Sequence, residues 1–224
     1  MARLRKSRKF IGAAGYHADT LYGGGAACLF SLEPARLFAG TAPLEVELGS
    51  GKGDFILEQA RQFPQRNFLA VELAGSVFQW LAIRVARSGL GNLRAIRADA
   101  RSVVNLMLPA AGVRAFHIYF PDPWPKSRHS KHRLISPALI NGLARCLEPG
   151  GQIYLATDVD WYFEHAAGLL RQGGFRLREA AVPAAQRTNF GRRFAAEGKT
   201  IHAGCFAMPG EIAAISYRAG RPDV

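Results

Sequence analysis

One short segment of the chain, residues 120–133, combines residue types that are seldom found side by side: FPDPWPKSRHSKHR. Asp122 stands between two prolines, and Trp124 follows closely. The prolines restrict the loop backbone, and an indole ring offers a face on which a nucleobase can stack. The residues that follow are mostly cationic and are candidates for contacts with the phosphates of a nucleic acid: Arg128, His129, Ser130, Lys131, His132 and Arg133. Such a run can also be an exposed basic loop without a ligand.

A second candidate site is a glycine-rich turn within EVELGSGKGDFILEQA. Gly49, Gly51 and Gly53 lie between an apolar run and a helical pattern. Glycines allow the backbone to approach a ligand closely, and the first amides of a helix are free to bind it. The turn therefore predicts a nucleotide or nucleoside cofactor, although dinucleotide folds, adenosylmethionine folds and simple tight turns share this spacing.

Acidic residues recur where successive apolar runs end. Glu47 lies in the first run, Glu72 ends the second, and Asp99 and Asp122 follow the third and fourth. In a doubly wound sheet the carboxyl ends of the strands line one crevice, so we expect these four side chains to meet there. Glu72 can accept ribose hydroxyls, Asp99 can meet an adenine amino group, and Glu47 can attract a cationic ammonium. Any one of them alone could be a solvated surface residue.

Short apolar runs alternate with helical patterns along most of the chain, which favours a parallel α/β sheet. The predicted strands are residues 44–48, 67–73, 93–98, 115–120, 151–157, 175–182 and a possible last one within 199–208. The predicted helices are residues 55–63, 76–89, 100–107, 136–151 and a further one that begins near residue 161. We therefore predict an α/β fold with a doubly wound, mostly parallel, seven-stranded Rossmann-like sheet and helices on both faces.

The chain of 224 residues, 49% of them apolar, can form one sizeable core. We predict a single domain over 43–208, a basic N-terminal arm over 1–42 with one short helix near 30–38, and a C-terminal extension over 209–224.

The net charge of +12 favours a polyanionic partner, although a basic composition can also serve solubility alone. Cys28, Cys146 and Cys205 are widely spaced without a C-x-x-C pair, so neither disulfides nor a metal site are expected, which fits a reducing cytoplasm. No apolar run suits a signal peptide or a membrane span, so a membrane partner is not expected either.

The whole stretch from about Leu44 to Ile201 resembles the bacterial tRNA (guanine-N7)-methyltransferase family. The resemblance rests on separated blocks in the family's order: the E-x-G-x-G-x-G loop, NFLAVEL, GLGNLRAIRADA, FPDPWPKSRHSKHRLISPALI, LEPGGQIYLATDVDWYFEH and RTNFGRRFAAEGKTIH. It implies the methyltransferase form of the fold, S-adenosylmethionine as cofactor and tRNA as partner. The implied reaction is methyl transfer to N7 of a guanine, at position 46 of the variable loop.

The resemblance also implies roles for individual residues. The implied cofactor-binding residues are Glu47, Gly49, Gly51, Glu72, Asp99, Ala100 and Asp122, with Asp122 also catalytic. The implied substrate-binding residues are Lys126, Asp158, Thr188, Asn189, Phe190 and Gly191, and residues 128–133 are the implied RNA-contact segment. Two positions depart from the family pattern: Gly191 stands where Glu is usual, and His132 where Arg is more usual.

Guanine N7 carries a lone pair in its neutral form, so attack on a methyl group needs no prior deprotonation. We expect Asp122 to stabilise the positive charge that develops on the base. Asp158 would accept hydrogen bonds from N1–H and the amino group, and Lys126 would contact O6 or a phosphate. We expect His117 to be packed within a strand and the cysteines to be core residues.

Three alternatives remain open at this point. The chain could methylate an exocyclic amino group, or it could be a nicotinamide-dependent oxidoreductase with a small substrate. It could also be a tRNA-binding homologue with reduced catalysis, as Gly191 would suggest. Its oligomeric state, monomer or homodimer, does not follow from the sequence.

Overall fold

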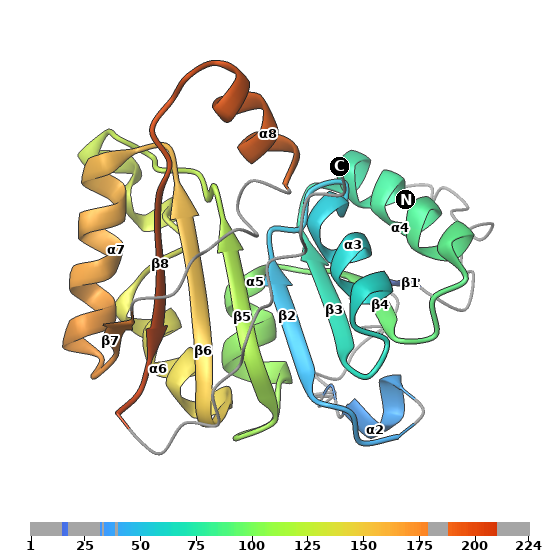
Figure 1. Ribbon diagram of the computed structural model, residues 1–224. Helices are drawn as coiled ribbons and strands as arrows, with labels where there is room; N and C mark the ends of the chain where they lie inside the picture. Colours follow the sequence, from blue (N-terminus) through green and yellow to red (C-terminus); the bar gives the residue numbers. More distant parts are fainter. Residues whose placement is uncertain (1–14, 18–31, 33, 39, 179–187, 210–224) are drawn as a thin grey trace, which may run out of the picture.

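The computed structural model describes residues 15–17, 32, 34–38, 40–178 and 188–209. These residues form a mixed sheet in the order β1-β4-β3-β2-β5-β6-β8-β7 (Figure 1). Neighbours from β1 to β6 in this order pair in parallel, whereas β8 runs antiparallel to both β6 and β7. The strands are β1 Gly15–His17, β2 Leu44–Leu48, β3 Asn67–Glu72, β4 Leu93–Arg97, β5 Val113–Tyr119, β6 Leu147–Thr157, β7 Arg176–Arg178 and β8 His202–Ala207.

This topology confirms the doubly wound, mostly parallel sheet, and all seven predicted strands are present. β7 is described only at Arg176–Arg178, because residues 179–187 lie outside the described part. The sheet has an eighth strand, β1, at its edge beside β4, which the sequence did not predict. Three residues in a glycine-rich stretch are too few to show alternation. Most of the predicted arm and extension lies outside the described residues.

Helices connect the parallel strands and cover both faces of the sheet. They are α2 Pro34–Leu37, α3 Asp54–Gln62, α4 Gly75–Ser88, α5 Ala100–Ser102, α6 Pro137–Cys146, α7 Asp160–Gln172 and α8 Asn189–Ala196. The predicted helix over 100–107 is in fact a short α5 that continues into a π-helix, η1 Val103–Met107. Residues 128–133, the basic segment, lie mainly in a 3-10 helix, η2 Ser127–His132. Helix α8 is not among the predicted helices.

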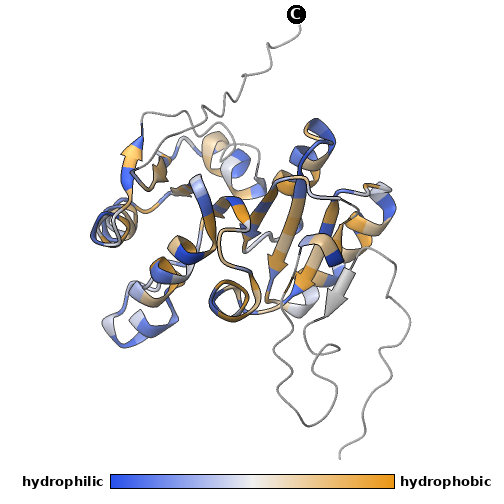
Figure 2. Ribbon diagram, turned by 90° about the horizontal axis from the view of Figure 1, so that it is seen from below, coloured by the Kyte–Doolittle hydropathy of each residue, from blue (hydrophilic) through white to orange (hydrophobic). Residues whose placement is uncertain are grey.

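Two apolar clusters lie on opposite faces of the sheet. One cluster joins alternate strand residues such as Val46 and Phe116 to η1, α6 and α7. The other joins Phe68 and Tyr119 to α3 and α4. Figure 2 shows hydrophobic strands at the centre with hydrophilic residues on the helices around them. Because both faces are covered, the sequences of the strands are nearly continuous apolar runs. Each large buried apolar side chain contributes about 1.5–3 kcal/mol to the free energy of folding.

Local signals explain where helices begin and end. Ser136 caps α6, because its Oγ accepts a hydrogen bond from the Leu139 amide at 3.3 Å, and Pro137 occupies the first turn. Gly89 ends α4 in a left-handed conformation with φ of 67°. Because β3, β4 and β5 run in the same direction, the loops that follow them lie at one edge of the sheet.

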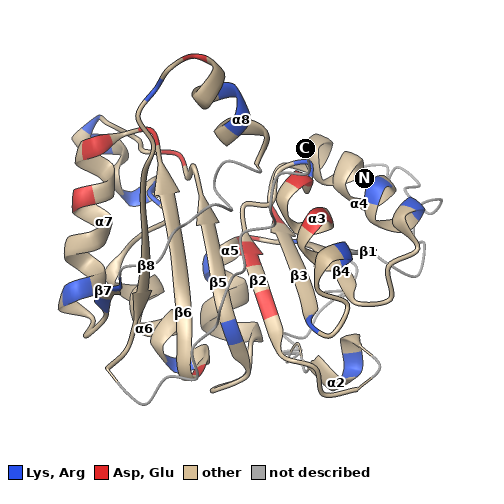
Figure 3. Cartoon of the chain, in the orientation of Figure 1, with Lys and Arg blue, Asp and Glu red and all other residues tan. Residues whose placement is uncertain are grey.

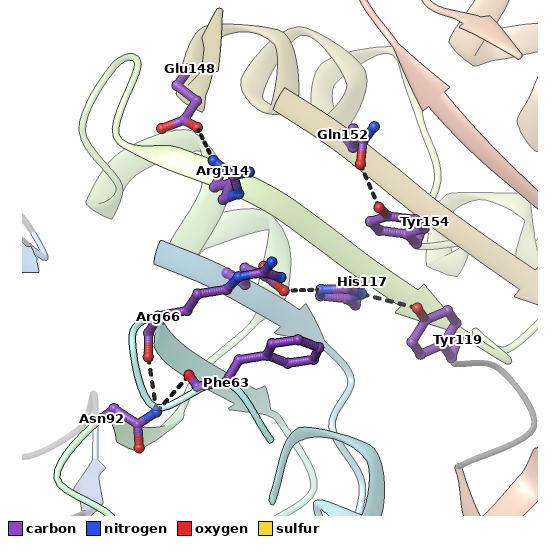
Figure 4. Close-up of polar contacts among 10 residues, drawn as sticks. Phe63, Arg66, Asn92, Arg114, His117, Tyr119, Glu148, Gln152 and Tyr154 are labelled. Carbon is purple, nitrogen blue, oxygen red and sulfur yellow. Dashed lines mark hydrogen bonds and ion pairs between the residues drawn. The ribbon is translucent and has the colours of Figure 1, made fainter. Parts of the chain in front are cut away.

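A buried polar network joins β2, β5 and the loop after α3 (Figure 4). The Glu45 carboxylate contacts Arg66 Nη1 at 2.9 Å and His117 Nε2 at 2.9 Å, and His117 Nδ1 lies 2.9 Å from the Tyr119 hydroxyl. Burial tends to raise the pKa of Glu45, but His117 and Arg66 outweigh it, so the net shift is downward. His117 is therefore packed and hydrogen-bonded, as predicted.

We expect Glu45→Ala to lower the free energy of unfolding by about 3–5 kcal/mol, because it leaves His117 and Arg66 without this buried carboxylate. The pKa of Glu45 is lowered in the native state, so its pairing stabilises the fold above its ordinary pKa of 4.5. That stabilisation is lost as the pH falls through the lowered pKa. Urea denaturation of the wild type and variant at several pH values measures the effect.

The control is Glu164→Ala on the exposed face of α7, which should change stability by no more than about 0.5 kcal/mol. A Glu45→Ala protein as stable as this control at neutral pH would contradict the stabilising role of the network.

Candidate cofactor and substrate cleft

A cleft of about 630 Å³ opens at the carboxyl ends of the parallel strands. It lies where the strand order reverses between β2 and β5, which is where doubly wound sheets bind ligands. The four strand-end acids Glu47, Glu72, Asp99 and Asp122 all line it. Of the other predicted site residues, the cleft is lined by Gly49, Gly51, Ala100, His132, Thr188, Asn189 and Phe190. The structure thus brings segments far apart in the sequence to one place.

The glycine-rich turn needs its glycines for conformation and for packing. Gly51 adopts φ of +56°, a left-handed conformation, and a Cβ added there would meet no atom within 4 Å. Gly53 also has a positive φ, and a Cβ there would clash with the Leu81 side chain of α4. The turn can therefore approach a ligand on one side while α4 packs closely on the other.

The carboxylate of Glu72 is held by two backbone amides. Its Oε2 accepts a hydrogen bond from the Gly51 amide at 2.9 Å, and its Oε1 accepts one from the Ala74 amide at 2.7 Å. Each carboxylate oxygen has a second lone pair, which can accept from a ligand hydroxyl. Glu72 thus connects the end of β3 to the glycine-rich turn.

Asp99 caps helix α5, a structural role in addition to the predicted ligand contact. Its carboxylate accepts from the amides of Arg101 and Ser102 at 2.9 and 3.2 Å, and it pairs with the Arg101 guanidinium at 3.0 Å. Burial tends to raise the pKa of Asp99, but these hydrogen bonds outweigh it and lower the pKa. The carboxylate is therefore fixed and charged at the wall of the cleft.

Glu47 has the most unusual environment of the four acids. Its side chain is buried, and its Oε2 has no hydrogen-bond partner among the described residues. Burial raises the pKa of Glu47 well above 4.5, the negative charges of Asp54 and Glu72 raise it further, and a hydrogen bond with Ser50 opposes the shift. A buried carboxylate at the wall of a cleft with an unsatisfied oxygen fits a cationic ligand group such as an ammonium.

The loop that carries Asp122 has an unusual backbone. Phe120 and Trp124, on either side of Asp122, both have positive φ values, of 50° and 43°. Such conformations are unfavourable for residues other than glycine and persist only where the surroundings hold them. The Phe120 amide donates to the Ala156 carbonyl at 2.7 Å, and its ring contacts Phe194 of α8 with a centroid distance of 5.4 Å. The Asp122 side chain is exposed at the cleft.

The basic segment follows this loop as the helix η2. The rings of His129 and His132 lie 5.7 and 5.2 Å from the ring of Trp124, so an aromatic cluster stands at the mouth of the cleft. Lys126, Arg128 and Lys131 are exposed and do not line the cleft. His129 and Ser130 do not line it either.

Arg133 differs from the other residues of the segment. Its guanidinium donates to the backbone carbonyls of Pro123 and Trp124 and lies over the ring of Trp161 at 5.0 Å. Arg133 belongs to the RNA-contact segment that the resemblance implies, but its guanidinium is engaged within the protein.

Helix α8 lies above the carboxyl ends of the central strands (Figure 1). Its N-cap is Thr188, whose Oγ1 accepts from the Gly191 amide at 2.8 Å. Thr188, Asn189 and Phe190 line the cleft, whereas Gly191 is buried in the first turn of the helix and does not. Arg192 pairs with Asp54 of α3 at 3.4 Å, which connects the two sides of the cleft. Figure 3 shows the basic residues of α8 beside acidic positions of α3 and the strand ends.

Asp158 is not among the residues that line the cleft. It follows β6, and its carboxylate lies 3.5 Å from Lys199 Nζ. The structure therefore places Asp158 and Lys126 outside the lining that the four acids share.

Among the described residues, no group of three His, Cys, Asp or Glu side chains could hold a metal ion. A search of the same residues finds no helix that is long and apolar enough to span a membrane. Cys146 and Cys205 are buried free thiols, as predicted for core residues, and burial raises the pKa of Cys205 to about 11. Cys28 lies outside the described residues.

Comparisons with known proteins agree with this geometry. A family model described as a putative methyltransferase matches residues 41–203. The solved structure of the 16S rRNA methyltransferase KamB aligns with a TM-score of 0.57 at 20% identity, covering 79% of this chain and 92% of that one. That identity supports the fold alone. Fold, cleft and family model together define the class of the protein, a methyltransferase with a Rossmann-like α/β fold.

Relatives define the family within this class. The tRNA (guanine-N(7)-)-methyltransferase of Nitrosococcus oceani is 38% identical over 173 residues, which cover 76% of this chain and 73% of that protein. The protein of the same name from Nitrosomonas europaea is 39% identical over 171 residues, which cover 74% and 76%. The chain belongs to the tRNA (guanine-N7-)-methyltransferase family, as its sequence blocks indicate.

Proposed function

We propose that the chain transfers the methyl group of S-adenosylmethionine to N7 of a guanine in tRNA, at position 46 of the variable loop. The observation that carries this proposal is the single cleft in which four strand-end carboxylates meet the loop of Asp122 and Trp124. The cationic segment that begins at that loop supplies the partner for a polyanion.

The residues of the cleft fit the proposed cofactor. Glu72 would accept the ribose hydroxyls, Asp99 the adenine amino group, and the unsatisfied oxygen of Glu47 would face the methionine ammonium. The cleft is also lined by Gly49, Gly51 and Ala100, so the backbone of these three residues would lie close to the bound cofactor. When bound, S-adenosylmethionine supplies an electrophilic methyl group.

Asp122 would act on the nucleobase. The carboxylate is exposed in the cleft, and its negative charge would stabilise the positive charge that develops on guanine as N7 is alkylated. The strained backbone on either side would keep the carboxylate in one position, which reduces the reorganisation needed during the reaction.

The proposed substrate contacts come from two sides of the cleft. Thr188, Asn189 and Phe190 of α8 would contact the nucleotide directly. Asp158 would accept hydrogen bonds from guanine N1–H and its amino group once the charge pair with Lys199 rearranges. Lys126 would contact O6 or a phosphate. Gly191 supplies only a backbone amide, which Thr188 already uses as the cap of α8.

The test is a transfer assay with the purified chain, radiolabelled S-adenosylmethionine and an unmodified tRNA transcript. We expect label to appear as 7-methylguanosine and to vanish with a transcript in which guanine 46 is replaced by adenine. Label at an exocyclic amino group would overturn the choice of atom. Tight tRNA binding without any transfer would support a homologue that has lost catalysis.

We expect Arg128→Gln together with Lys131→Gln to weaken tRNA binding and to reduce its salt dependence. Both side chains are exposed on η2. Each lost phosphate contact reduces the slope of log K against log salt concentration by about 0.7–0.9, so the pair should reduce it by about 1.4–1.8. Filter binding at several salt concentrations measures the slope.

The matched control is Arg171→Gln together with Arg176→Gln, which removes the same charge. Arg171 lies in the last turn of α7 and Arg176 begins β7, and both are exposed at the opposite end of the sheet (Figure 1). An equal loss of slope in both double variants would show that net charge, not the basic segment, determines binding.

A further inference from the structure

The loop around Asp122 requires support from outside itself. Its two left-handed residues, Phe120 and Trp124, are unfavourable in isolation, and the segment between them contains two prolines that cannot donate hydrogen bonds. On the Phe120 side, the support comes from the Ala156 carbonyl and the rings of α8. On the Trp124 side, the side chain of Arg133 holds the loop backbone by hydrogen bonds to its carbonyls.

Arg133 contacts this backbone with a forked geometry. Its Nε donates to the Pro123 carbonyl at 3.2 Å and to the Trp124 carbonyl at 3.3 Å, and its Nη2 donates to the Trp124 carbonyl at 3.1 Å. The other face of the guanidinium lies over the ring of Trp161, with Cζ 5.0 Å from the ring centroid. The guanidinium is therefore held between the loop and the first turn of α7.

The position of Arg133 separates it from its neighbours in the basic segment. Arg133 is half-buried, whereas Arg128 and Lys131 are exposed. Burial raises the pKa of the Tyr162 hydroxyl, while the positive charge of Arg133 lowers it and the negative charge of Asp122 raises it. The charges of Arg133 and Asp122 thus both act on the same buried hydroxyl, which places the two side chains near each other.

We propose that Arg133 is a positioning residue that holds the Pro123–Trp124 backbone, and with it the carboxylate of Asp122, in the geometry needed for methyl transfer. It acts through the loop and contacts neither RNA phosphate nor the reacting atoms. The inference rests on the proposed function, because the reaction it serves is the proposed transfer to guanine N7.

The geometry requires Arg at this position. A guanidinium is planar, and it can donate to two carbonyls while stacking on an indole. A Lys ammonium has the same charge but cannot provide this fork, so Arg133→Lys keeps the electrostatic attraction for RNA and removes the geometry. A displacement of about 1 Å at a reacting group can reduce the rate about a hundredfold.

The experiment compares kcat, the Kd for tRNA and the salt slope of binding in the wild type and in Arg133→Lys. We expect kcat to fall about tenfold to a hundredfold, with the Kd and the slope unchanged. The matched control is Arg171→Lys, an exposed position on α7 outside the cleft, which should leave all three quantities unchanged. Melting temperatures establish that each protein is folded.

A second variant tests the same contact from its other side. Trp161→Leu removes the ring that faces the guanidinium and keeps every charge. We therefore expect kcat to fall again, with the Kd for tRNA unchanged. In the double variant the effects should not add, because both changes release the same side chain.

The other outcomes overturn the inference. A weaker Kd with a shallower salt slope in Arg133→Lys would make Arg133 a phosphate contact, and wild-type kcat in either single variant would remove the positioning role. Absence of transfer by the wild type would instead overturn the proposed function.

Discussion

Asp122→Ala should reduce methyl transfer by at least about a hundredfold, and up to about a thousandfold, without unfolding the protein. The physical reason is the loss of a fixed negative charge beside the base as its positive charge develops. The side chain is exposed, so its removal should leave the melting temperature unchanged. Single-turnover assays with saturating tRNA measure the effect on the chemical step.

Two further variants separate charge from other causes. Asp122→Asn keeps the shape and most hydrogen-bonding capacity but removes the charge, so it should be nearly as slow as Asp122→Ala. Glu164→Ala removes an exposed acid on α7 and should behave as the wild type. Near-normal turnover in Asp122→Asn would contradict charge stabilisation, and near-normal turnover in Asp122→Ala would exclude any catalytic role.

Glu47→Gln should stabilise the free protein at neutral pH and weaken cofactor binding about tenfold or more. The wild-type carboxylate is buried with an unsatisfied oxygen, which destabilises its charged form until a cation binds there. A neutral amide avoids that destabilisation but loses the attraction to the ammonium. Scanning fluorimetry and titration with S-adenosylhomocysteine measure the two effects.

The sign of the pH dependence follows from the raised pKa of Glu47 in the native state. Below its ordinary pKa of 4.5 the side chain is protonated in both states, and the wild type and Glu47→Gln should have similar stability. As the pH rises through the raised pKa, the wild type should lose stability relative to the variant. Each kcal/mol gained by the variant should raise the melting temperature by about 2–4 °C.

Glu164→Gln is the control, since it makes the same chemical change on an exposed helix face. If Glu47→Gln bound S-adenosylhomocysteine as tightly as the wild type, Glu47 would have no part in cofactor binding. If its stability relative to the wild type did not vary with pH, the buried charge would be excluded as the cause.

The sequence predicted the sheet and the edge at which the cleft lies, because both depend on local patterns. Short apolar runs, separated by segments with helical periodicity, identified the strands. In a parallel sheet the ends of these strands lie at one edge, so Glu72 and Asp99 had to meet there. The glycines of the turn were recognisable because left-handed conformations and close packing favour glycine.

The sequence could not predict features that depend on distant contacts. β1 is only three residues long and is defined by its pairing with β4. The direction of the Arg133 side chain depends on a loop nine and ten residues earlier in the chain. The unsatisfied oxygen of Glu47 depends on how completely α3 and the glycine-rich turn cover β2.

Some missed features did carry a local signal. Asp99 precedes a short helical pattern, as N-cap residues do, and Thr188 stands in the same relation to α8. The residue type and the position of Asp99 and Thr188 are therefore enough to predict a cap. Helix α8 itself was missed because NFGRRFAA is short and contains a glycine near its start.

The central claim is that this cleft methylates guanine N7 in tRNA, and the most direct measurement is the nucleoside composition of tRNA from cells that lack the protein. We predict that 7-methylguanosine at position 46 is absent from that tRNA, returns when the wild-type protein is supplied, and does not return with Asp122→Ala. Undiminished 7-methylguanosine in the deficient cells, in a strain without a second enzyme for this position, would contradict the claim.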